Sequence, residues 1–162
     1  MDLRGIASVV EPRDIKLGLF YLQSDHDGGA WLCLRVGQSD GHHESRIWDI
    51  VFDRPDRHGI FFSEPRDVAP VVALPPISVR IDHTSLVGTQ FSTNFGSPMI
   101  AVAGQDAFVK TPYNNRGSLT FNLATGEVVS PPSGWVAFSR WSLVIDGDNG
   151  EIALFSNSAN GS

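Results

Sequence analysis

The chain has 162 residues, of which 41% are hydrophobic and 19% are charged, and its formal net charge is −6. This length and composition predict one globular domain with its own core, and they argue against a disordered chain. Nucleic acid is excluded as a partner, because phosphate binding needs clustered Lys and Arg, and Lys16 and Lys110 are the only lysines.

The N-terminal residues have neither the basic region nor the apolar region of a signal peptide, and no stretch resembles a membrane span. We therefore expect a soluble, cytoplasmic protein that does not bind membranes. Cys33 is the single cysteine, so no intrachain disulfide can form. Its strand-like context predicts a small buried hydrophobic residue rather than a nucleophile.

In chain order, the first half of the sequence predicts short strands separated by turns. Apolar runs lie at residues 6–10, 16–23, 30–36, 46–52 and 60–62, and the two runs that flank 24–29 predict a hairpin. Segment 64–76 contains Pro65, Pro70, Pro75 and Pro76, so we expect an extended loop there and neither a helix nor a central strand. Further runs follow at 77–82, 85–91, 99–103 and 106–110.

Residues 117–155 show the clearest strand pattern. Leu119, Phe121 and Leu123 alternate with polar residues, as expected for a half-buried strand. Gly-containing turns at 124–126 and 146–150 predict hairpins, and 135–145 predicts one bent strand or two. The sequence thus predicts a single all-β domain at 1–155, an antiparallel β-sandwich or jelly-roll-like fold with a closed β-barrel as the alternative, followed by a flexible polar tail at 156–162.

Two short motifs resemble functional sites but lack the context that those sites need. Residues 37–41 match the G-x-S-x-G nucleophile motif, which requires a following helix, whereas a strand is predicted here. Residues 146–151 resemble the start of a calcium loop, but Gly150 stands at the fifth position, where a ligand is expected. We interpret the second motif as a hairpin turn, with Ca²⁺ binding as the alternative.

The histidines suggest a metal site. In an antiparallel fold successive connections alternate between two ends, which places 24–29, 53–59, 83–84 and 146–150 at one end. His26, His58 and His83 would then share that end with several carboxylates, and such a set could hold Zn²⁺ or another divalent metal. The alternative is that these are ordinary solvated loop histidines.

The opposite end would carry a second group of polar and aromatic residues. Neighbouring residues on a strand point to opposite faces, so the adjacent His pair does not form a cupin-like metal site. The group could bind a sugar or a protein loop by stacking and hydrogen bonding, or it could simply form turns. Its members are His42, His43, Glu44, Tyr113, Asn114, Asn115 and Arg116.

Trp135 and Trp141 are candidates for an exposed aromatic platform, with core packing as the alternative. We carry three functional hypotheses. The first is a non-catalytic protein-interaction domain, such as an immunity- or adaptor-type acidic binder, because its negative charge suits a basic partner. The others are a carbohydrate-binding module and a metal-binding β-domain or metalloenzyme. Enzyme activity and a cofactor are not expected, apart from the Zn²⁺ or Ca²⁺ alternatives.

Overall fold

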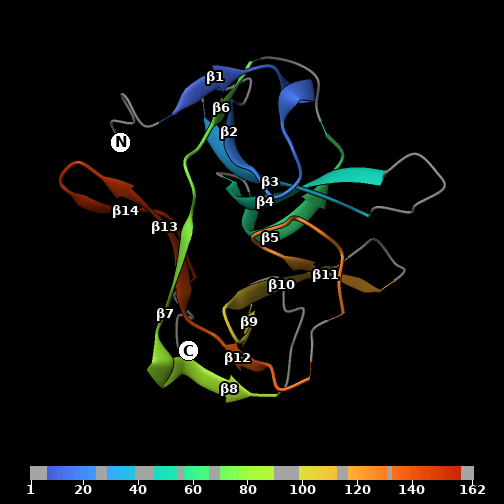
Figure 1. The fold of residues 1–162 in the computed structure, drawn as a ribbon, viewed down its shortest axis with the longest axis vertical. Helices are drawn as coiled ribbons and strands as arrows, with labels where there is room; N and C mark the ends of the chain where they lie inside the picture. The colour runs from blue at the N-terminus through green and yellow to red at the C-terminus, as the bar shows by residue number, and fades with distance from the viewer. Residues whose placement is uncertain are drawn as a thin grey trace.

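The computed structural model describes residues 7–24, 29–38, 46–54, 57–65, 70–89, 99–112, 117–130 and 133–157. Within these ranges the chain forms β-strands and two single-turn 3₁₀ segments, η1 (Pro12–Asp14) and η2 (His83–Ser85), and no α-helix (Figure 1). None of the described segments is a helix with the length and hydropathy of a membrane span.

The strands form three antiparallel sheets. Sheet I contains β1 (Ser8–Val10), β2 (Phe20–Ser24), β3 (Ala30–Gln38), β4 (Arg46–Arg54), β5 (Arg57–Ser63) and β6 (Val71–Ala73), in the order β1-β6-β2-β3-β4-β5. Sheet II contains β8 (Leu86–Gly88), β9 (Ile100–Ala103), β10 (Asp106–Pro112), β11 (Ser118–Asn122) and β12 (Val136–Phe138), in the order β11-β10-β9-β12-β8. Sheet III contains β7 (Ser78–Ile81), β13 (Trp141–Gly147) and β14 (Gly150–Asn157), in the order β14-β13-β7.

The predicted all-β class is confirmed. The main core contains side chains of all three sheets, so one face of sheet I packs against sheets II and III, as in a sandwich. Its centre is aromatic: the ring of Phe52 makes edge contacts with Trp141 at 6.5 Å and with Phe155 at 5.5 Å between centroids. No sheet of the described strands closes on itself, so the closed-barrel alternative is wrong.

Sheet I is buried on both faces. Leu32, Leu34 and Val36 on β3 point into the main core, while Cys33 belongs to a second apolar cluster on the other face. This cluster includes Ile15, which the chain brings over the sheet after β1. A strand buried on both sides needs a nearly continuous apolar run, which is what β3 has. The predicted burial of Cys33 is confirmed.

The proline-rich segment contains a strand, so the prediction that it holds no central strand was wrong. Strand β6 lies between β1 and β2, with Val72 opposite both Val9 and Leu22. Pro70 immediately precedes β6, and Leu74 separates β6 from Pro75. All three residues of the strand therefore keep their backbone N–H groups. A strand of three residues, with prolines on either side of it in the sequence, can thus pair with a neighbouring strand on each side.

Sheets II and III are joined by a two-stranded ribbon that changes sheet at a corner. Residues 135–145 form two strands, of which β12 pairs with β8 in sheet II and β13 pairs with β7 in sheet III. At the corner, residues 82–85 lie opposite residues 139–140, because Ile81 pairs with Trp141 and Leu86 pairs with Phe138. The two extra residues on one side bend the ribbon, as a large bulge does.

Polar groups of the corner satisfy one another. The Asp82 carboxylate accepts from the backbone N–H and the hydroxyl of Thr84 at 2.8 and 2.6 Å, and from Arg140 Nε at 2.8 Å. The Ser85 hydroxyl donates to the Asp82 carbonyl at 2.6 Å and accepts from the Arg140 N–H at 3.0 Å. Asn157 Nδ2 donates to the Ser139 carbonyl at 2.8 Å, so β14 extends to the corner, two residues into the segment predicted as a tail.

Sheets I and II meet at a close approach of backbones. The Gly37 N–H of β3 donates to the Gly126 carbonyl at 2.9 Å, and the Val128 N–H donates back to Gly37 at 3.2 Å. Gly126 has φ of +70°, and a Cβ on it would lie 2.3 Å from the Gly18 nitrogen and 2.5 Å from the Arg35 carbonyl oxygen. Only glycine therefore fits at this position.

We predict that Gly126→Ala lowers the free energy of unfolding by about 3 kcal/mol or more, because backbone strain and a clash with immovable backbone atoms add together. Gly104→Ala is the matched control. Gly104 also has a positive φ, +62°, but open space surrounds its missing Cβ, so strain alone should cost about 1–2 kcal/mol. Urea unfolding measures both losses, and equal losses would contradict the described close approach.

The hydrogen bonds at the corner predict an unusually low pKa for the Asp82 carboxyl group. Hydrogen bonds from the Thr84 side chain and backbone, followed by that from Arg140, lower the pKa of Asp82 from 3.8 to about 2. Because the folded pKa is depressed, this carboxylate stabilises the fold above the unfolded pKa, and the contribution is lost as the pH falls through about 2. Carboxyl NMR titration should give this value, and Thr84→Val should raise it more than Arg140→Gln does. A pKa near 3.8 in the unmodified protein would show that the corner is not formed.

Candidate functional site

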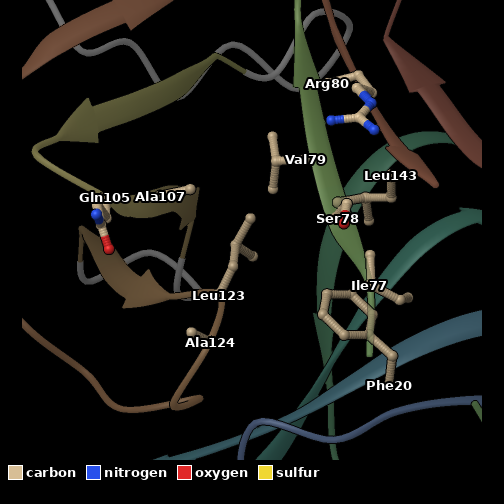
Figure 2. Close-up of a pocket in the computed structure, with 10 residues that line it drawn as sticks. All are labelled: Phe20, Ile77, Ser78, Val79, Arg80, Gln105, Ala107, Leu123, Ala124 and Leu143. Carbon is tan, nitrogen blue, oxygen red and sulfur yellow. The ribbon is translucent and has the colours of Figure 1, made fainter. Parts of the chain in front are cut away.

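An open cleft, lined by both apolar and polar residues, runs along β7. We define the β7 cleft by the residues that line it, and its volume is about 310 Å³ (Figure 2). These residues are Phe20, Ile77, Ser78, Val79, Arg80, Gln105, Ala107, Leu123, Ala124 and Leu143. A volume of this size is at the lower end of that seen for ligand sites.

The cleft has two walls from segments far apart in the chain. One wall is β7 and the residue before it, where four consecutive residues, 77–80, line the cleft. Across from it stand Gln105, in the turn between β9 and β10, and Ala107 on β10, while Leu123 and Ala124 come from the turn after β11 (Figure 2). Phe20 of sheet I lies toward one end in this view.

A second hollow of about 340 Å³ continues the cleft toward sheet I. It shares Phe20, Ile77, Leu123 and Ala124 with the first, and adds Pro75 and Pro76 together with Gly18, Leu19 and Leu74. Leu119, Phe121 and Leu123 were predicted to share a strand face, but nothing in the sequence indicated that Leu123 would line a cleft beside residues 77–80. The alternating pattern of 77–82 predicted a strand there, but it did not indicate a cleft beside it.

Several residues predicted as site residues lie outside the described residues. These are His26, His42, His43, Glu44, Tyr113, Asn114, Asn115 and Arg116. His58 lies on β5, and its side chain is outside the described part. The ligand-binding and metal-binding roles of these residues stay predictions.

The structure tests part of the arrangement behind the metal hypothesis. In sheet I, Ser24 pairs with Ala30 and Arg54 pairs with Arg57, so the connections after β2 and after β4 share an end, as predicted. The exposed His83 sits at the corner, where its ring lies 6.0 Å from that of Phe138. Among the residues that the structure describes, no group of three or more His, Cys, Asp or Glu could hold a metal ion.

The turn at 146–150 does not share an end with His83, so that prediction was wrong. Trp141 at the start of β13 pairs with Ile81, beside the corner, whereas the turn follows Gly147 at the other end of the strand. The prediction assumed that connections alternate between two ends of one fold, and it took account neither of β6 nor of the passage of the chain from one sheet to another. Gly147 pairs with Gly150, which confirms the hairpin interpretation of this turn.

Trp141 cannot belong to an exposed aromatic platform. It is 3% exposed and packs in the main core against Phe52 and Phe155. The platform hypothesis therefore loses one of its two members, while Trp135 is half-buried. Complete burial of a large aromatic side chain removes more apolar area from water than stacking of one face on a ligand does.

A buried polar cluster, which the sequence did not reveal, lies on the second face of sheet I. Arg35 and Asp49, 5% and 2% exposed, form an ion pair between β3 and β4, with Nε donating to the carboxylate at 2.7 Å. The same guanidinium donates to the Pro12 carbonyl at 3.3 Å and to the Tyr21 hydroxyl at 3.4 Å. The cluster thus connects the η1 segment to the sheet beneath it.

Burial governs the ionisation of this cluster. Burial raises the pKa of the Tyr21 phenol far above its usual range, so this hydroxyl keeps its proton. It also raises the pKa of Asp49, against the lowering effect of Arg35. Burial lowers the pKa of Arg35, but the hydrogen bond and charge of Asp49 outweigh this and raise it. Asp49 thus keeps Arg35 charged, while Arg35 opposes the effect of burial on Asp49.

We predict that Arg35→Met lowers the free energy of unfolding by about 3–5 kcal/mol, because it leaves the Asp49 carboxyl buried without its cation. The double variant Arg35→Met/Asp49→Leu should recover most of this loss, since it removes both buried charges together. Urea unfolding of the two single variants and the double variant measures the coupling. A double variant as unstable as the sum of its single losses would contradict the pairing.

Comparison of the chain with protein-family models, with curated proteins and with solved structures gives no match. The function must therefore be argued from the geometry and charge of the chain itself.

Proposed function

We propose that this domain is a non-catalytic binding domain that recognises a segment of another protein at the β7 cleft. The observation that carries the proposal is the cleft itself, an open hollow beside the edge strand of sheet III, whose lining combines the apolar side chains of Ile77, Val79 and Leu123 with polar residues. Open apolar surface next to a strand edge is a recurring site for peptide recognition. An immunity- or adaptor-type protein would use such a surface.

The charge distribution supports a basic partner. The formal net charge of the chain is −6, which attracts cations at long range. Asp106 is exposed and follows Gln105 on one wall of the cleft, and Asp146 is exposed two residues past Val144, the partner of Ser78. Among the described residues neither carboxylate takes part in an ion pair. Exposed carboxylates on the strands that flank the cleft favour a segment with Lys or Arg beside its apolar residues.

The other two hypotheses have less support in the described residues. The carbohydrate hypothesis depended on exposed tryptophans, and Trp141 is in the core. The metal hypothesis depends on His26 and on the side chain of His58, which lie outside the described part, together with His83.

We predict that an identified protein partner binds the purified domain with salt-dependent affinity. The immobilised domain would first be used to retain proteins from an extract of the source cells at low ionic strength. Each retained protein would then be purified, and its affinity for the domain measured by isothermal titration calorimetry. Binding should weaken as salt rises, because ions screen exposed charges over about 10 Å at 0.1 M.

Two double variants that each remove two negative charges test where on the domain the charge matters. Asp106→Asn/Asp146→Asn should weaken binding several-fold at low salt and much less at high salt. Glu11→Gln/Asp14→Asn is the control, because it removes two exposed carboxylates from the η1 segment instead. If no purified protein binds the domain, or if both double variants bind like the unmodified domain, the proposed function is wrong.

A further inference from the structure

We infer that β7 accepts an extended segment of the partner as an additional antiparallel strand, and that this segment carries apolar residues at alternate positions and Lys or Arg at its ends. The inference rests on the proposed function and specifies how the partner is held. It follows from the direction of the β7 backbone groups, the lining of the cleft and the negative charge of the chain.

The hydrogen-bonding pattern of β7 leaves backbone groups directed away from β13. In an antiparallel pair, hydrogen-bonded and non-hydrogen-bonded residue pairs alternate along the strands. The Asp82 N–H donates to the Arg140 carbonyl at 3.1 Å, which makes these two residues a hydrogen-bonded pair. The pairs of Arg80 with Ser142 and of Ser78 with Val144 are therefore hydrogen-bonded too.

The backbone N–H and C=O groups of Val79 and Ile81 consequently point to the other side of β7. That side is the edge of sheet III, because β7 has no second neighbour among the described strands. The cleft opens beside this edge, between β7 and the β9–β10 hairpin (Figure 2). Unused backbone groups beside an open cleft can pair with an added strand.

The one charged side chain of β7 is held away from this edge. Arg80 forms an ion pair with Glu151 of β14, which lies beyond β13 on the side opposite the free edge. Figure 2 shows its guanidinium directed to the side of β7 that faces away from Ala107. A lysine or arginine often protects an edge strand by projecting from it, but the ion pair keeps this guanidinium from doing so.

The shape of the cleft sets the chemistry of the added strand. Ile77, Val79 and Ile81 share one face of β7 and pack against the main core. Residues directly opposite one another in an antiparallel pair have side chains on the same face, so alternate residues of the partner would enter the cleft between Val79, Ala107 and Leu123. A hollow of about 310 Å³ suits side chains of the size of Val or Ile.

A single strand fits this site better than a second copy of the domain. Pairing between two β7 edges would bring a whole second sheet III against the wall formed by Gln105 and Ala107. Asp106 on β10 and Asp146 on β13 are exposed and form no ion pair among the described residues, and together with the net charge of −6 they favour cationic residues at the ends of that strand.

The probe for this inference is the peptide Lys-Val-Thr-Val-Thr-Val-Lys. In NMR titrations of the full chain it should shift the backbone amides of Val79 and Ile81 saturably and slow their hydrogen exchange. A peptide with Glu at both ends should bind several-fold more weakly at low salt. No saturable shift at β7 with either peptide would overturn the inference.

Peptides with N-methylated backbones test the hydrogen bonds without changing the domain. In an antiparallel pair the three Val residues of the peptide have their N–H groups directed at β7, whereas the Thr residues have theirs directed away. N-methylation of the Val residues should reduce affinity at least tenfold, and N-methylation of the Thr residues should leave it nearly unchanged. Equal affinity for the two methylated peptides would overturn strand addition.

A cleft-filling variant separates this inference from the proposed function. Ala124 has an exposed side chain that lines the cleft, so Ala124→Trp should block the peptide while far-UV circular dichroism stays unchanged. Ala153→Trp, at an exposed position on β14, is the control. If a purified protein partner binds Ala124→Trp and the unmodified domain equally, the β7 site is wrong and the proposed function stands. If no purified protein binds either form, the proposed function itself fails.

Self-association gives a distinct result. If sedimentation showed a dimer of the domain that Ala124→Trp dissociates and Ala153→Trp does not, the occupant of the edge would be a second copy, and the inference would be overturned. A monomer at the concentrations used for the titrations is the expected result.

Discussion

The bend in the ribbon between sheets II and III is the constraint on which the second layer depends. Residues 82–85 lie opposite only residues 139–140, so the strands cannot continue in register and the layer divides into two sheets. Asp82 and Ser85 satisfy the backbone and side-chain groups that the bend exposes, together with Arg140 and Thr84. Because β7 ends at this bend, it remains a short edge strand beside an open cleft.

Sheet I provides the rigid layer against which this arrangement forms. Its strands are apolar on the side of the main core, and its other face carries the ion pair of Arg35 with Asp49 beneath the η1 segment. Replacement of a buried ion pair by apolar residues often stabilises a protein, so we interpret this pair as a device that fixes where η1 lies. The glycine contact at Gly126 then sets the distance between sheets I and II.

Local patterns in the sequence were sufficient for the fold class but not for the site. The alternation around Leu119 and Phe121 correctly predicted a strand, although Leu123 lies in the turn that follows it, and the turn at 146–150 correctly predicted a hairpin, because both signals are short-range. Strand β6 was missed because its flanking prolines dominate a segment in which only three residues pair. Ion pairing between β3 and β4, the burial of Trp141 and the cleft all depend on contacts between distant segments, which periodicity cannot reveal.

The central claim is that β7 presents free backbone groups to an open cleft, and native-state hydrogen exchange of the unbound domain tests it most directly. The alternation of pairs predicts that the amides of Ser78 and Arg80, which donate to β13, exchange slowly. The amides of Val79 and Ile81 should exchange much faster, although they lie on the same strand. Equal protection of all four amides would show that this edge is already paired, and it would contradict the account.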